Sequence, residues 1–201
     1  MHAAEADTAR IQALRTSYLR WIRQFDARRL VFIDEAGSHI AMSREYAWAP
    51  RGARASDAVP RNRGTVTTII GALTVDGLTA VMTLEGGTSG DVFAAYVEKV
   101  LLPELLPGDL VVMDNLGAHK DVRIRPLIES AGARVVYQPP YSPDLNPIEL
   151  AWSKLKWWLR MAKARTHEAL DTAIAMALEG VITSEDAVAW FRHCGYGAQL
   201  M

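Results

Sequence analysis

The sequence predicts an α/β protein in which helices flank a mixed sheet of about five strands. Three observations support this fold class. Short, continuous apolar runs are typical of buried strands, a β-branched segment predicts a hairpin, and helical periodicities occur before, between and after them. Hydrophobic residues make up 50% of the 201 residues and charged residues 22%, which is typical of a folded globular chain.

The first part of the chain predicts a helix, a strand, a loop and a hairpin. Apolar residues recur at steps of three and four over residues 5–26, which indicates an amphipathic helix. The run LVFI then predicts a strand buried on both faces that ends at Asp34. Residues 37–64 contain glycines and prolines and predict a loop, with a short strand near EYAWAP. The segment TVTTIIGALTVDGLTAVMTLEG predicts two strands joined by a turn at Asp76–Gly77.

The second part of the chain alternates helices with two further strands and ends in helices. Thr166 and Ser184 are the expected N-caps of the last two helices. The expected elements are a helix from Ser89 or Gly90 to about Leu102, the strand LVVM ending in Asp114, a helix over 121–131, the strand RVVYQP, and helices over 147–162, 167–180 and 184–194.

Composition excludes several classes of protein. The net charge of -1 argues against a uniformly basic nucleic-acid coat, although a local basic face stays compatible with it. Cys194 is the single cysteine, so the chain forms no internal disulfide, which fits a reducing compartment. The N-terminal segment lacks the apolar core of a signal peptide, and no run of about 18 apolar residues predicts a membrane span. We therefore expect a soluble cytoplasmic protein.

Two aspartates have matched positions at the ends of predicted buried strands. Asp34 follows LVFI and Asp114 follows LVVM. Sites in open α/β sheets gather at the carboxyl ends of strands, and neighbouring parallel strands lie about 4.8 Å apart. Two carboxylates that close are unfavourable unless one binds a proton or a divalent cation lies between them. Either aspartate alone is also compatible with a turn residue or a helix N-cap.

A third carboxylate, Glu149, lies in the stretch YSPDLNPIELAWSKLK. Asn146 is a good N-cap and Pro147 suits the first helical position, so Glu149 can complete a capping box. The same position in the first helical turn also favours an ionised carboxylate, because the helix dipole is positive there. The sequence therefore supports both a capping role and a metal-ligand role for Glu149.

Three ordered blocks, VFIDEAG, VVMDNLGAHK and PPYSPDLNPIELAWSKLK, resemble the signature blocks of the DDE transposases. More narrowly, they resemble the bacterial insertion-sequence branch of the mariner superfamily, as do WAPRG and WFRHCGY. The 34 residues between Asp114 and Glu149 are a spacing that this superfamily uses. The resemblance extends over nearly the whole chain from about Leu30 onward.

This resemblance implies a ribonuclease H-like fold, two Mg²⁺ or Mn²⁺ ions in the active site, and DNA cleavage and strand transfer at transposon ends. Asp34, Asp114 and Glu149 match the three catalytic, metal-binding acids, and Asp144 is a rival for the third position. Glu35 is either a spare acid of the site or a strand-end residue, and the latter is preferred. The implied organisation is an N-terminal helix or linker over 1–29, a catalytic domain over 30–165 and C-terminal helices over 166–201 on the same domain.

DNA is the implied partner, in a homodimer that joins two DNA ends, near the nucleoid of a bacterial cell. The segment before the first strand is too short for the helix-turn-helix region that reads transposon ends, so that region is expected to be separate or missing. The lysines could instead form a solvated helix face that does not bind DNA. His119 could instead be a surface loop histidine or play an outer-shell role. The expected DNA contacts are Arg51, Arg54, Arg61, Arg63, Asn115, His119, Lys154, Lys156 and Arg160.

Two other functions stay open at this point. One is a catalytically silent transposase remnant that only binds DNA or dimerises. The other is a metal-dependent phosphatase of different fold, which the hairpin before Asp114 and the helical position of Glu149 argue against.

Overall fold

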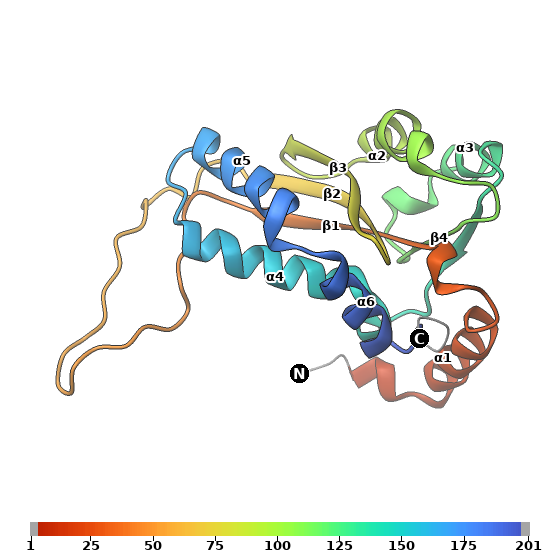
Figure 1. The fold of residues 1–201 in the computed structure, drawn as a ribbon, viewed down its shortest axis with the longest axis horizontal. Coiled ribbons are helices and arrows are strands. Elements are labelled where there is room, and N and C mark those ends of the chain that lie inside the picture. Colours follow the sequence, from red (N-terminus) through yellow and green to blue (C-terminus); the bar gives the residue numbers. More distant parts are fainter. Residues whose placement is uncertain (1–3, 198–201) are drawn as a thin grey trace.

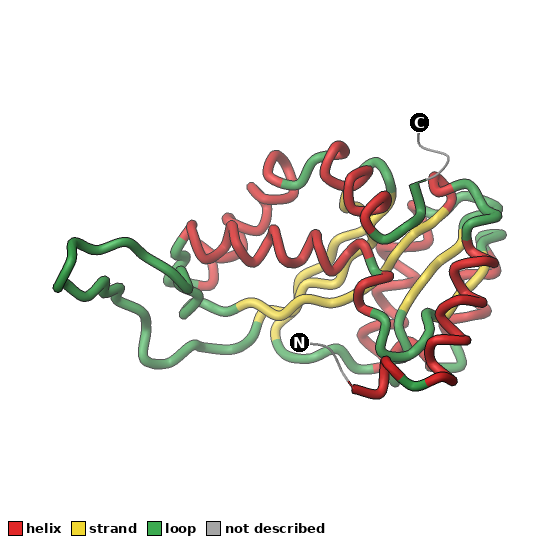
Figure 2. Tube along the Cα trace, turned by 90° about the horizontal axis from the view of Figure 1, so that it is seen from below, coloured by secondary structure: helices red, strands yellow, loops and turns green. Residues whose placement is uncertain are grey.

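The computed structural model describes residues 4–197, which form a five-stranded mixed sheet with helices on both sides (Figures 1 and 2). The spatial order is β3-β2-β1-β4-β5, with antiparallel pairing from β3 to β1 and parallel pairing from β1 to β5. The predicted fold class is therefore confirmed. The strands are β1 (Leu30–Ser38), β2 (Thr67–Thr74), β3 (Gly77–Glu85), β4 (Leu110–Met113) and β5 (Arg134–Tyr137).

The helices follow the predicted order. Short 3₁₀ segments occur at Ala4–Asp7, Ala27–Arg29, Leu102–Glu104, Ala118–Lys120 and Pro143–Leu145, and π-helical segments at Val97–Leu101 and Ala177–Val181. The α-helices are α1 (Ala9–Ile22), α2 (Gly90–Tyr96), α3 (Ile124–Ser130), α4 (Pro147–Ala162), α5 (His167–Met176) and α6 (Ser184–His193). None of these helices is long and apolar enough to cross a lipid bilayer.

Alternating side chains of β1 divide the hydrophobic core into two layers. Leu30 and Phe32 pack in the cluster that includes residues of α4 and α6, whereas Val31 and Ile33 pack in the cluster that includes residues of α2 and α3. Because successive side chains of a strand point to opposite faces, the same alternation directs Asp34 toward the α4 side. It directs the next residue, Glu35, toward the α2 and α3 side.

A close contact between α4 and the sheet brings the start of α4 near Asp34. Trp152 is buried, and a Cβ added to Gly71 would lie 3.1 Å from the Trp152 ring. Gly71 is the cross-strand partner of Asp34 in β2. Glu149 lies one helical turn before Trp152, on the same side of α4. The missing side chain at position 71 therefore lets α4 approach the sheet where Asp34 lies.

Two sequence predictions about β1 and the following loop were wrong. β1 does not end at Asp34, because its antiparallel pairing with β2 continues to Ser38 after the parallel pairing with β4 has stopped. Among residues 39–66, all of which are described, no strand forms near EYAWAP. This segment is a long loop that extends away from the body of the molecule (Figure 1), and the side chain of Trp48 is fully exposed.

Two local predictions were displaced by one residue. Thr74 and Gly77 pair with each other, so the hairpin turn consists of Val75 and Asp76 rather than Asp76–Gly77. The N-cap of α6 is Thr183, not Ser184, and it forms a capping box with Asp186. By contrast, Thr166 caps α5 as predicted, and its side chain accepts a hydrogen bond from the Ala169 amide.

Candidate active site

Asp34 and Asp114 lie at the same level of the neighbouring parallel strands β1 and β4. The register of β1 and β4 pairs Phe32 with Val112, and each aspartate lies two residues beyond its member of that pair. Asp34 and Asp114 line one cavity of about 420 Å³ together with Glu149 from the first turn of α4. The structure thus brings together the three acids that the sequence analysis selected.

A loop after β5 forms the opposite wall of this cavity. It joins β5 to α4 and contains three prolines, and Tyr141 adopts a left-handed conformation with φ of 55°. Asn115 and Leu116, which follow Asp114, also line the cavity. The lining residues of the loop and the start of α4 are Gln138, Pro139, Pro140, Tyr141, Ser142, Pro143 and Asn146.

The expected capping box at the start of α4 does not form. Asn146 occupies the N-cap position, but its side chain makes no capping hydrogen bond. Its backbone amide, which Glu149 would have accepted from, donates instead to the Pro143 carbonyl at 2.9 Å. The buried Asn146 Oδ1 has no hydrogen-bond partner among the described residues. The Glu149 carboxylate is therefore available to the cavity.

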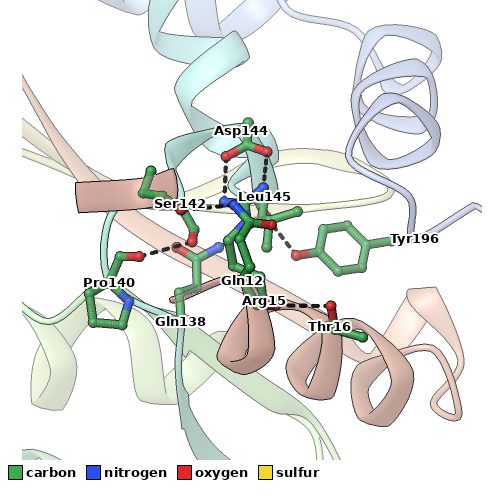
Figure 3. A network of polar contacts seen from close by, with 10 residues as sticks. Gln12, Arg15, Thr16, Gln138, Pro140, Ser142, Asp144, Leu145 and Tyr196 are labelled. Atoms are coloured by element: carbon green, nitrogen blue, oxygen red, sulfur yellow. Dashed lines mark hydrogen bonds and ion pairs between the residues drawn. The ribbon is translucent and has the colours of Figure 1, made fainter. Parts of the chain in front are cut away.

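Asp144, the rival third acid, is bound elsewhere. Its Oδ1 and Oδ2 accept hydrogen bonds from Arg15 Nη1 and Nη2 at 2.8 and 2.5 Å, and Figure 3 shows this two-point contact. Asp144 is not among the residues that line the cavity. Of the two candidates, only Glu149 therefore accompanies Asp34 and Asp114 in the cavity.

The carboxyl group of Asp34 is in an environment that disfavours its negative charge. Burial raises its pKa most, followed by repulsion from Glu149, and together with Glu35 and Asp114 they bring the pKa to about 7. Partial burial also raises the pKa of Glu149, and Asp114 raises it further, whereas Lys156 lowers it. A bound cation would reverse this repulsion, because it favours the ionised form of each acid.

Asp114 has the opposite electrostatic environment. Its contact with His119 lowers its pKa most, and its Oδ1 also accepts a hydrogen bond from the Leu116 amide at 2.8 Å. His119 Nδ1 lies 2.7 Å from Asp114 Oδ1, an ion-pair distance, although the ring is not aligned for a hydrogen bond there. On the other side, His119 Nε2 lies 3.2 Å from Glu35 Oε2.

His119 is held as a buried cation between these two carboxylates. Burial by itself would lower its pKa, but Asp114 and Glu35 outweigh burial and raise the pKa to about 9. The Phe93 ring packs against the imidazole at a tilt, with 4.4 Å between centroids, and Tyr137 Oη donates to the His119 carbonyl at 2.9 Å. The side chain of His119 is fully buried, which argues against the predicted direct DNA contact and favours the outer-shell alternative.

The sequence analysis missed the partnership between Glu35 and His119. Glu35 does not line the cavity and is neither a spare acid of it nor a strand end, because β1 continues beyond it. The alternation of β1 carries the signal that could have revealed this, since it directs Glu35 to the face opposite Asp34. The alternation does not identify the partner of Glu35, because His119 comes from a distant part of the chain.

Some of the expected DNA-binding residues are engaged by other groups of the protein, and others are exposed on the long loop. Asn115 is committed to the protein, since its Nδ2 donates to the Gln138 carbonyl at 2.7 Å, and Lys154 forms an ion pair with Asp186. Arg160 Nη2 lies 2.6 Å from Glu45 Oε1. Lys156 lies close enough to Glu149 to lower its pKa. The other four predicted contacts, Arg51, Arg54, Arg61 and Arg63, are all exposed on the long loop.

The three acids fit a divalent cation by chemistry but are not a ready-made cage. Within residues 4–197, no three histidine, cysteine, aspartate or glutamate side chains converge closely enough to hold a metal ion as they stand. Carboxylate oxygens are nevertheless the ligands that Mg²⁺ and Mn²⁺ prefer. Asp114 Oδ1 is instead engaged by His119 Nδ1 and the Leu116 amide. A cation would draw Asp114 and Glu149 toward Asp34.

The fold and the cavity together define a ribonuclease H-like protein with three carboxylates at the end of its parallel strands. A family model described as DDE superfamily endonuclease matches residues 29–171. Because this match covers most of the sequence, the chain belongs to that family. Among proteins with curated descriptions, none matches this chain in sequence.

Solved structures of Mos1 transposase share the fold. The Mos1 transposase paired-end complex with left transposon end has a TM-score of 0.75 and 17% identity, covering 98% of this chain and 60% of the Mos1 chain. The catalytic domain of Mos1 mariner transposase has a TM-score of 0.64 and 15% identity, covering 98% of this chain and 91% of that chain. This chain thus spans 60% of the longer Mos1 chain and most of the isolated catalytic domain.

Proposed function

We propose that this chain is the catalytic domain of a transposase that uses divalent metal ions to cleave and transfer DNA strands at transposon ends. The observation that carries the proposal is the meeting of Asp34, Asp114 and Glu149 in one cavity of a DDE superfamily endonuclease fold. The proposal includes membership of the bacterial insertion-sequence branch of the mariner superfamily, and the resemblance of the three signature blocks supports it.

In this proposal the three acids hold two Mg²⁺ or Mn²⁺ ions. Asp34, Asp114 and Glu149, which line the same cavity, are the residues that would hold these ions. When bound, the ions supply nucleophile activation and stabilise the leaving oxygen of a phosphodiester. Mos1 paired-end complexes have been solved with Mn and with Mg, which supports the choice of metals.

The other residues of the site keep the acids in place and attract DNA. His119 fixes the orientation of Asp114 and balances its charge, as outer-shell partners do for metal ligands. Lys156 beside Glu149 and the exposed arginines of the 39–66 loop supply positive charge for phosphate contacts. DNA is the proposed partner, and a homodimer is the proposed active assembly because two DNA ends must be joined.

Nicking of a supercoiled plasmid tests the proposed function. The wild-type protein should nick DNA in Mg²⁺ or Mn²⁺ and not in a chelator, and Asp114→Asn should abolish nicking. Asp171→Asn, which removes an exposed carboxylate on α5, is the matched control and should behave as wild type. Equal nicking by wild type and Asp114→Asn would point to a contaminating nuclease and contradict the proposal. DNA binding by the wild type without any nicking would support the alternative of a catalytically silent DNA-binding module.

A further inference from the structure

The N-terminal helix α1 contacts the loop that forms one wall of the acidic cavity. Arg15 of α1 makes the two-point ion pair with Asp144, two residues before Asn146, the N-cap of α4 (Figure 3). The Arg15 side chain is only 18% exposed, so its position is largely fixed by the surrounding protein. A two-point pair between guanidinium and carboxylate restrains orientation as well as distance.

A second set of contacts holds the same loop from inside the protein. Tyr196 Oη donates to the Leu145 carbonyl at 2.6 Å and lies 3.2 Å from Tyr18 Oη of α1. Gln138 Nε2 donates to the same carbonyl at 3.0 Å, and Figure 3 shows Gln138 and Tyr196 on either side of Leu145. Tyr18, Tyr196 and Gln138 are all buried, so little water competes for these hydrogen bonds.

These contacts reach two of the three acids. The Gln138 amide donates to the Met113 carbonyl at 2.9 Å, and the Gln138 carbonyl accepts from Asn115 Nδ2 at 2.7 Å. These two residues flank Asp114 in the chain. The other end of the network, Leu145, lies next to Asn146, whose carbonyl accepts the Glu149 amide at 3.1 Å. The positions of Asp114 and Glu149 therefore depend on the same hydrogen-bonded loop.

The loop itself stores backbone strain. The non-glycine residue Tyr141 has φ of 55°, a left-handed conformation that is unfavourable for a residue with a Cβ. Such a conformation persists only when the surrounding structure imposes it. The hydrogen bond from Ser142 Oγ to the Pro140 carbonyl, at 3.1 Å, spans Tyr141, and the ion pair of Asp144 with Arg15 follows it in the chain.

We propose that Arg15 and Tyr18 of α1, with Tyr196, form a brace that positions Asp114 and Glu149 for metal binding. The three are positioning residues, since they act through the 138–146 loop and do not line the cavity. The brace makes the metal affinity of the site dependent on where α1 lies. This inference rests on the proposed function, because it takes the acids to be metal ligands.

Mn²⁺ binding without DNA, followed by electron paramagnetic resonance, tests the brace on the whole chain. Arg15→Ala, Asp144→Asn and Tyr196→Phe should each weaken Mn²⁺ binding by about three- to tenfold, less than the 10–100-fold typical of outer-shell partners that touch a ligand. Tyr196→Phe keeps the ring that packs 5.0 Å from Phe32, so it removes the hydrogen bonds with little change to the core. The charge swap Arg15→Asp with Asp144→Arg should recover most of the lost affinity.

Two controls separate positioning from general stability. Arg20→Ala removes an exposed arginine of α1 and should bind Mn²⁺ as wild type does. Asp186→Asn removes the ion pair with Lys154 and weakens the capping box of α6, so it should lower the melting temperature without weakening Mn²⁺ binding. Measurements are made well below the lowest melting temperature in the series.

The possible outcomes distinguish failure of the proposed function from failure of the brace. If the wild type binds no Mn²⁺, the proposed function fails. If the wild type binds Mn²⁺ but Arg15→Ala, Asp144→Asn and Tyr196→Phe all match Arg20→Ala, the proposed function stands and the brace is refuted. Equal weakening by Asp186→Asn would likewise refute the brace, because loss of stability alone would then explain the effect.

Discussion

Asp34 in β1 and Asp114 just after β4 lie at the same level of the sheet, but the two aspartates differ in charge environment. Asp34 is buried among other acids, and its pKa is raised to about 7. Asp114 is half exposed and lies beside the buried imidazole of His119, and its pKa is lowered. At neutral pH, without a cation, the first carboxyl group carries a proton much of the time and the second is ionised.

This difference shows how a fold can prepare a cavity for a cation. Asp114 already has its compensating charge on the side away from the cavity, in the pair of His119 and Glu35. Asp34 has no such partner among the charges that set its pKa, all of which are acidic. The site therefore combines one acid fixed in its ionised form with one whose ionisation is favoured by a bound cation.

The largest expected effect is on DNA cleavage, where the two aspartates should behave alike. Asp34→Asn and Asp114→Asn should each lower the nicking rate by on the order of 10³-fold or more, since each removes a proposed metal ligand. Plasmid nicking in Mg²⁺, with Asp171→Asn as the control, measures this. If one of the two variants kept most of its nicking activity, that aspartate would not be a metal ligand, and the two aspartates would not share the proposed role.

Replacement of His119 should have the next largest effect, because it removes the feature that distinguishes Asp114. His119→Gln should lower nicking by about 10–100-fold through loss of an outer-shell partner. It should also destabilise the fold, since Glu35 is left buried without its cation. The wild-type pair stabilises the protein fully below pH 6.5, and that contribution is lost as pH rises through about 9.

Thermal melting across pH checks this loss, and Glu35→Gln is the companion variant. If His119→Gln melted at the same temperature as wild type between pH 6 and 8, the imidazole would not be the buried cation described here.

The metal-free protein should lose stability as pH rises through the titration of Asp34. A raised carboxyl pKa means that the folded state binds the proton more tightly than the unfolded state. The penalty is therefore absent below pH 3.8 and fully developed above about pH 7. Asp34→Asn should remove this penalty and raise stability at pH 8 by on the order of 4 kcal/mol, whereas Asp114→Asn should lower it.

Chemical denaturation of metal-free protein at pH 5 and pH 8 measures both variants. The two should shift stability in opposite directions at pH 8, in contrast to their equal loss of nicking. A stability shift of the same sign for both variants would contradict the difference in charge environment between Asp34 and Asp114.

Replacement of Lys156 should have the smallest effect. It tests whether the positive charge beside Glu149 contributes to DNA binding. Lys156 lowers the Glu149 pKa while burial and Asp114 raise it. Lys156→Ala should weaken DNA binding by about threefold and reduce the slope of log affinity against log salt by about 1. Asn62→Ala, in the exposed loop, leaves the charge unchanged and is the control. An unchanged salt slope would place Lys156 outside the DNA path.

The sequence was sufficient to predict the sheet and α4 because their signals are local. Continuous apolar runs defined β1 and β4, and an N-cap followed by proline defined the start of α4. The end of β1 was misplaced because a strand ends where its pairing ends. At Asp34 only the parallel partner stops, while the antiparallel partner continues to Ser38.

The sequence predicted the three acids of the candidate site but not the residues that hold them in position. Matched strand ends and the signature blocks selected Asp34, Asp114 and Glu149. The contacts of Glu35 with His119 and of Arg15 with Asp144 join residues that are distant in the chain, and no local pattern encodes such a pair. The same limit applies to Glu149. Its capping role was plausible from spacing alone, but the Asn146 amide is already bonded to the Pro143 carbonyl.

Anomalous diffraction from crystals soaked in Mn²⁺ at pH 8 tests the central claim most directly. The account predicts a Mn²⁺ peak about 2.2 Å from a carboxylate oxygen of Asp34, with Asp114 or Glu149 as a further ligand and with Asp114 turned toward the cavity. Mn²⁺ bound elsewhere at full occupancy, with Asp34 uncoordinated and still separated from the other two acids, would contradict it.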